Sequence, residues 1–258
     1  MCRASAVVAL TIASLVSMFA GSAQAEDLRT DLSSRSERDP AAGRSYLGPT
    51  ALTAPAGQAT VTLRMPFYPA IAGSLAVGLT DRVEVFVGGG AAIIIFDESN
   101  YPARFVSGGA KLQVLRSRRA ALALTASAYR RPAYFHSDPF DDGWNEPRLV
   151  VGEIGVVGSA CLDDRCGVVA SAHAHVIPEI WGGNEKTVWG GGSIVAGRGF
   201  SRLVADATVM SSDDDHGFVG YVGYRATGEQ VAFDVGALIF GDVNDIVPWP
   251  TVGLSARF

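Results

Sequence analysis

Glu153, His173 and His175 are the tightest group of residues in this sequence that could do chemistry. Two imidazoles and a carboxylate are donors that bind transition metals. The histidines are separated by one residue, so in a strand they share a face, and Glu153 joins that face if its strand forms a hairpin with theirs. A third or fourth ligand beyond them is not identifiable, so the group is only a weak metal candidate, and hydrogen bonding inside a packed polar interior is the alternative.

Other charged residues recur at alternating positions of apolar stretches, which predicts that they point away from lipid into a lumen. The residues assigned to this lumen are Arg64, Glu84, Lys111, Glu153, His173, His175, Arg202, Asp206, Asp234 and Arg257. Basic and acidic side chains balance within the set. Because unpaired charges in a narrow lumen are costly, we expect mutual ion pairs among them.

Twelve apolar stretches carry these residues, close in length to the ~9–11 residues of a tilted membrane-spanning strand. The expected strands are 58–65, 70–79, 82–94, 104–115, 119–130, 148–160, 167–177, 187–197, 201–210, 217–225, 230–240 and 251–258. Short turns alternate with mostly longer polar loops, as in bacterial outer-membrane barrels. The sequence therefore predicts an all-β fold, an antiparallel transmembrane β-barrel of about 12 strands.

The N-terminus has the pattern of a secretory signal peptide, residues 1–25. An apolar run follows Arg3, and small residues precede the expected cleavage site after Ala25. Residues 26–57 are polar and then rich in Pro, Gly and Ala, which predicts a partly disordered periplasmic segment ahead of a barrel at 58–258. Cys161 and Cys166 stand close together in a chain bound for an oxidising compartment, so we expect a disulfide between them.

The last stretch ends on Phe258, with Val252, Leu254 and Ala256 on the same face. In this respect the chain resembles the broad class of Gram-negative outer-membrane β-barrels, whose last strand typically ends in an aromatic residue. The resemblance implies an outer-membrane location and recognition of 251–258 by the outer-membrane assembly machinery. The "Gly-Leu-Thr-Asp" turn at 78–81, preceded by 46–50, also looks like that of uncharacterised barrel proteins.

These features predict a non-enzymatic outer-membrane barrel, either a narrow porin-like channel or a structural protein, in contact with outer-membrane lipid and lipopolysaccharide. The alternative is a soluble secreted or periplasmic barrel that binds a small apolar ligand. A hydrolase like outer-membrane phospholipase A is less expected, since no nucleophile with a nearby base is visible. No cofactor is indicated. The net charge of −5 and the lack of a basic patch give no sign of nucleic-acid binding.

Overall fold

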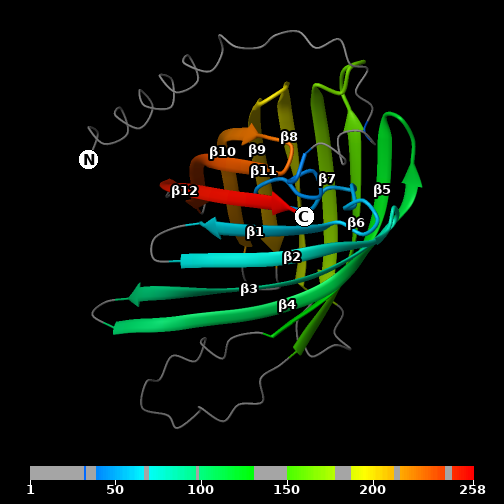
Figure 1. Ribbon diagram of the computed structural model, residues 1–258. Helices are drawn as coiled ribbons and strands as arrows, with labels where there is room; N and C mark the ends of the chain where they lie inside the picture. Colours follow the sequence, from blue (N-terminus) through cyan, green and yellow to red (C-terminus); the bar gives the residue numbers. More distant parts are fainter. Residues whose placement is uncertain are drawn as a thin grey trace.

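The chain folds into a closed antiparallel β-barrel (Figure 1). A computed structural model describes Leu32 and residues 39–66, 70–96, 99–130, 150–177, 187–211, 216–241 and 246–258. The strands are β1 (Ala59–Met65), β2 (Ala70–Thr80), β3 (Val83–Phe96), β4 (Ser99–Arg116), β5 (Ala120–Arg130), β6 (Val150–Cys161), β7 (Val168–Ile177), β8 (Thr187–Arg198), β9 (Ser201–Ser211), β10 (His216–Thr227), β11 (Val231–Gly241) and β12 (Ile246–Arg257). Each pairs with its neighbours along the chain, and β1 pairs with β12.

The predicted fold class and strand number are confirmed. Among the described residues, no helix has the length and apolar character needed to cross a membrane. The signal peptide predicted at 1–25 and most of the long loops lie outside the described residues. Two strands begin earlier than expected, because β4 already starts at Ser99 and β12 at Ile246.

The early start of β12 includes Pro248 and Pro250, which suggested a loop. Proline lacks a backbone N–H and is tolerated where a strand has no partner on one side. The short β1 pairs with β12 only from Val252 to Arg257. At Pro248 and Pro250, β12 has β11 as its only neighbour among the described strands. No backbone N–H is needed there for a hydrogen bond to β1, so proline fits at both positions.

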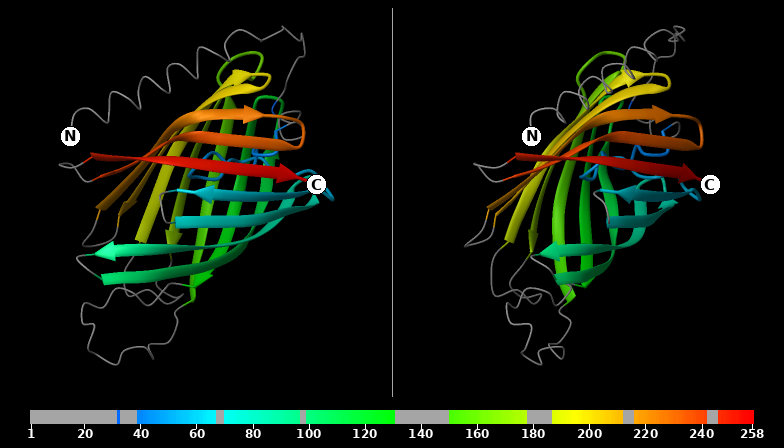
Figure 2. Two further views of the ribbon diagram at one scale, coloured as in Figure 1. Left: turned by 60° about the vertical axis from the view of Figure 1, so that its left-hand side comes forward. Right: turned by 90° about the vertical axis from the view of Figure 1, so that its left-hand side faces the viewer.

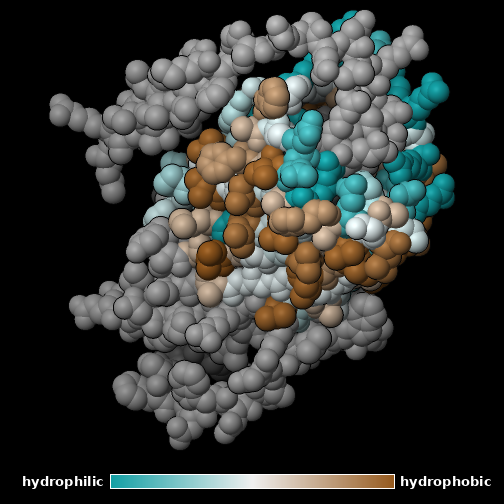
Figure 3. Space-filling view, in the orientation of Figure 1, coloured by the Kyte–Doolittle hydropathy of each residue, from teal (hydrophilic) through white to brown (hydrophobic). Residues whose placement is uncertain are grey.

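Apolar side chains cover the outside of the barrel, and polar ones line the inside. Outward-facing residues such as Leu63, Leu124 and Leu203 are each about half exposed. Their neighbours along the strands, Thr62, Thr125 and Val204, face inward and are buried. Figure 3 shows one face of the barrel on which apolar side chains form a broad brown area and hydrophilic ones gather toward the right of the view. Such a surface is the reverse of that of a soluble protein.

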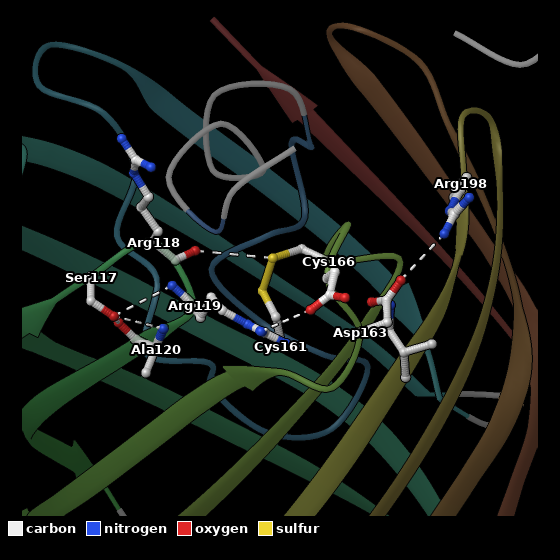
Figure 4. The surroundings of a disulfide bond; sticks show 10 residues. Ser117, Arg118, Arg119, Ala120, Cys161, Asp163, Cys166 and Arg198 are labelled. Atoms are coloured by element: carbon white, nitrogen blue, oxygen red, sulfur yellow. Dashed lines mark hydrogen bonds and ion pairs between the residues drawn. A yellow bond between two sulfur atoms is a disulfide. The ribbon is translucent and has the colours of Figure 1, made fainter. Parts of the chain in front are cut away.

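The turn between β6 and β7 contains the predicted disulfide, Cys161–Cys166 (Figure 4). Cys161 ends β6, while Cys166 lies in the turn with a positive φ of 49°, so the face alternation of the strands does not apply to it. Asp163 accepts the N–H of Val168 at 2.8 Å and also meets Arg198. The hydrogen bond from Val168 holds the pKa of Asp163 below its ordinary value.

Candidate functional site in the barrel lumen

The lumen contains residues 39–54, which precede β1 and are enclosed by the strands (Figure 2). Most of them are buried, including Tyr46 at 1% and Ala51 at 0% exposure. The segment folds on itself through turns, among them a bond from Ser45 N to Gly48 O. We call residues 39–54 the inserted segment. Its sequence has no period of 2 or 3.6, so nothing in its pattern indicated that it packs inside the barrel.

Lumen side chains hold the inserted segment by its backbone. Asp206 accepts the N–H of Tyr46 at 2.7 Å and that of Leu47 at 3.2 Å. Glu84 accepts the N–H of Ala54 at 2.7 Å. Further bonds run from Gln113 to Ala51 O, from Ala51 N to Ser159, and from Lys111 to Gly43 O. These contacts satisfy backbone groups that would otherwise be buried without a partner.

Arg225 is the most deeply buried charge of the lumen, at 1% exposure. Its Nε donates to Asp234 at 2.7 Å, and its Nη1 reaches Ala41 O and Arg44 O of the inserted segment at 3.5 Å. Arg225 and Asp234 are directly opposed in the β10–β11 ladder. Sequence analysis missed Arg225 because glycines and aromatic residues occur on both faces of its strand. Counting residues outward from the short turn at 228–230 pairs Arg225 with Asp234, and this pairing would have assigned it to the lumen.

Tyr46 anchors the middle of the inserted segment. Its ring stacks on Tyr221 with centroids 3.9 Å apart, and the guanidinium of Arg64 lies 4.9 Å from the same ring. The hydroxyl of Tyr46 bonds to Thr251 of β12. Val195, Val204 and Leu238 complete this apolar cluster. The segment is therefore attached to the barrel by both apolar packing and hydrogen bonds.

A second cluster lies at the long-loop end of the same lumen. Glu153 Oε1 and His175 Nδ1 lie 2.7 Å apart, and Trp189 Nε1 donates to Glu153 Oε2 at 3.0 Å. The imidazole of His175 stacks on Trp189 with centroids 3.9 Å apart. His173 meets both rings edge-on, at 5.5 Å from His175 and 5.2 Å from Trp189. We call these four residues the histidine cluster.

Strand register and two glycines shape the histidine cluster. Gly155, His175 and Trp189 are directly opposed on β6, β7 and β8, which brings the two rings side by side. A Cβ at Gly155 would collide with Nδ1 of His175. A Cβ at Gly48 of the inserted segment would likewise collide with His173. The cluster therefore occupies space left by one glycine of the wall and one of the segment.

The chemistry available to this cluster is proton transfer. A carboxylate next to one imidazole nitrogen fixes the orientation of the ring, so that the other nitrogen can transfer a proton. Nε2 of His173 and both ring nitrogens of His175 are buried without a hydrogen bond to any described residue, although Oε1 of Glu153 lies only 2.7 Å from Nδ1 of His175. The Nε2 atoms of the two histidines are thus available to a ligand, in a site with little water.

The metal hypothesis gains no support from this geometry. Within the part of the chain that the structure describes, no group of three or more His, Cys, Asp and Glu residues converges as a metal ion requires. Glu153, His173 and His175 do come together, but the two imidazoles are arranged around Trp189. They do not converge on a common point.

The remaining residues assigned to the lumen serve the inserted segment more than one another. Lys111 and Glu84 pair at 3.1 Å, as the charge balance suggested. Arg202, however, pairs with Asp39 of the segment, and Arg64 donates to Ser45 O at 3.0 Å. Arg257 lies at the short-turn rim and donates to Glu229 O. Mutual pairs within the set therefore form at Lys111–Glu84 and Glu153–His175, whereas Arg64, Arg202 and Asp206 meet the inserted segment, which offers them closer partners.

Comparisons with known proteins give no family for this chain. No family model matches it, and no curated protein matches it. Among solved structures, it is similar to LpxR from Salmonella typhimurium, with 8% identity and a TM-score of 0.49 over 78% of this chain and 99% of that one. It is also similar to the N-terminal β-barrel domain of Pseudomonas aeruginosa OprF, with 10% identity and a TM-score of 0.24 over 79% and 98%. These are likenesses of fold alone.

The prediction of a non-enzymatic narrow channel or structural protein is wrong. The lumen is not a narrow charge-balanced passage, since residues 39–54 occupy it. A soluble barrel with an apolar ligand inside does not fit the same structure, whose apolar side chains face outward and whose lumen side chains are largely polar.

Proposed function

We propose that this protein is an exported β-barrel of a Gram-negative outer membrane whose lumen carries an acid–base site for a hydrolytic reaction. The outward apolar side chains support the membrane location, because such a surface is stable only in contact with lipid. Lipid and lipopolysaccharide are then its surroundings, and the assembly machinery would recognise the strand that ends at Phe258.

The single observation that carries the proposed activity is the contact of Glu153 with His175. His175 is 4% exposed and Glu153 is 8% exposed, so water competes little for either group. In this arrangement Glu153 orients the ring, and Nε2 of His175 takes a proton from water or from a hydroxyl of the substrate. Trp189 holds the carboxylate from the other side.

The direction of access follows from the two ends of the barrel. The inserted segment fills the lumen, and the small cavity of about 20 Å³ between it and the wall has room for about one water. Glu153, His175 and Trp189 lie near the ends of β6, β7 and β8 that lead into the long loops. A substrate would therefore enter from the long-loop side, which faces the cell exterior in barrels of this class.

The activity can be tested with 4-nitrophenyl esters of increasing acyl length and purified protein in detergent. His175→Asn should lower hydrolysis by about 10²–10⁴-fold, the usual contribution of a general base. Glu153→Gln should lower it less, because the imidazole remains. His216→Asn, at the start of β10 outside the cluster, is the matched control. Equal rates for the wild-type protein and His175→Asn with every ester would overturn the proposal.

Location requires a separate experiment. Cells that express the chain should be fractionated into periplasm, inner membrane and outer membrane. We expect the mature protein in the outer membrane, with migration on gels that changes on heating. Recovery in the periplasmic fraction without detergent would contradict the membrane assignment and leave the acid–base site to be judged by its own assay.

A further inference from the structure

Arginines concentrate on one side of the short-turn rim. Arg116 ends β4, Arg118 and Arg119 form the β4–β5 turn, and Arg165 lies in the β6–β7 turn next to it. We call these four residues the arginine rim. On the opposite side, the β10–β11 turn carries Glu229, which is beside a single arginine, Arg257. Basic side chains are therefore densest at the β4–β5 and β6–β7 turns.

Two carboxylates partly compensate this charge. Arg119 pairs with Asp164 at 2.9 Å, but both side chains are exposed, at 56% and 93%. Asp163 is engaged by Arg198 and by the N–H of Val168. The side chain of Arg118 is exposed and has no hydrogen-bond or ion-pair partner among the described residues, and Figure 4 shows its guanidinium directed away from the disulfide. Exposed pairs of this kind are easily exchanged for another anion.

Exposed apolar side chains lie directly beside the arginine rim. A register shift in β4 between Gln113 and Leu115 makes Val114 and Leu115 both point outward, at 43% and 53% exposure. Leu162 of the neighbouring turn is 59% exposed. On a membrane barrel, the line where an apolar outer surface meets a row of arginines marks the boundary between the acyl chains and the headgroups of the bilayer.

From this placement we infer that the arginine rim binds the phosphate of an anionic phospholipid in the leaflet that meets the short turns. The inference rests on the proposed membrane location. Arg118, and Arg116 beside its long 3.4 Å bond from Nη1 to Asp81 O, present planar guanidinium groups that donate to phosphate oxygens, while Val114, Leu115 and Leu162 contact the acyl chains. A lipid satisfies both features at once, whereas free phosphate would use only the arginines.

The test uses the full mature protein in vesicles with spin-labelled phosphatidylglycerol or phosphatidylcholine. Electron spin resonance then measures the motionally restricted fraction of each lipid. The wild-type protein should prefer phosphatidylglycerol, and Arg116→Gln with Arg118→Gln should reduce this preference by about fivefold for each arginine removed. Replacing both by lysine should restore most of it. Arg82→Gln with Arg198→Gln changes two arginines at the short-turn end of the barrel that do not belong to the arginine rim. This control pair should have a smaller effect.

Each outcome bears on a different claim. Equal association of both lipids with the wild-type barrel, or an equal loss in the control pair, would overturn the inference. Inorganic phosphate that removes the preference at millimolar concentration would show a simple anion site and would also overturn it. Failure of the wild-type protein to insert into any vesicle would instead contradict the membrane location. Circular dichroism and heat-modifiable migration verify that each variant is folded.

Discussion

The contact between Glu153 and His175 depends on a neighbour without a side chain. Gly155 lies directly opposite His175 on β6, and the imidazole occupies the space that a methyl group would take. The residues of the contact were visible in the sequence as a group. Their mutual arrangement was not, because it depends on this glycine and on Trp189, which lies in a strand whose two faces could not be told apart.

Gly155→Ala should therefore displace His175 from Glu153. Overpacking of this kind costs about 1–3 kcal/mol, so the unfolding temperature should fall and hydrolysis should fall with it. Gly158→Ala is the matched control on the same strand, because a Cβ there meets nothing within 4 Å. Thermal unfolding and the ester assay provide the measurements. Equal behaviour of the two variants would show that the ring does not need this space.

At the scale of elements, the β6–β7 turn combines a disulfide with a charged cap. Asp163 accepts the N–H of Val168, and this bond lowers its pKa. A carboxyl group with a lowered pKa in the folded state stabilises above its unfolded pKa of about 3.9, and the effect is lost as pH falls through the folded value. Asp163→Asn should therefore unfold at a lower temperature than the wild-type protein at pH 6, and the difference should disappear in strong acid. A difference that stays constant with pH would rule out the charge as its cause.

The closing seam between β1 and β12 supports a second prediction about an element. Phe258 exchanges two backbone hydrogen bonds with Ala59 at 2.9 and 3.0 Å, and its side chain is 77% exposed at the rim. At the rim a charge costs only about 0–1 kcal/mol in lipid, so Phe258→Asp should act through the lost assembly signal. We expect little mature protein in the outer membrane, with refolding from urea into detergent nearly unchanged. Normal amounts in cells would contradict a role in recognition.

The strands could be predicted from sequence, and the contents of the lumen could not. Alternation along a strand has a strict period of two, so Val252, Leu254 and Ala256 are enough to assign a face. The inserted segment has no such period, since its backbone is held by distant side chains such as Asp206 and Glu84. Contacts of this kind leave no local pattern. The same reason explains why Arg202 was expected to pair inside the wall and instead meets Asp39.

At the scale of the whole molecule, the inserted segment decides what can pass through the barrel. Residues 39–54 fill the lumen next to Tyr221 and Arg225, so the wild-type protein should show no conductance steps in planar bilayers. Deletion of these residues, with β1 intact, should produce steps, because polar side chains then line an open space. Detergent-refolded protein with verified heat-modifiable migration is required for both recordings. Steps of porin size from the wild-type protein would show that the segment leaves the lumen.

The position of the inserted segment immediately before β1 also sets an order of events during biogenesis. β1 closes the barrel by pairing with β12, which follows the other eleven strands along the chain, so we expect the segment to be inside before that pairing forms. After closure the segment is held by hydrogen bonds such as those of Asp206 and Glu84 to its backbone, so we expect it to leave the wall rarely. Arg44 lies within the segment, so the rate of trypsin cleavage at Arg44 would measure how often the segment comes away from the strands that enclose it.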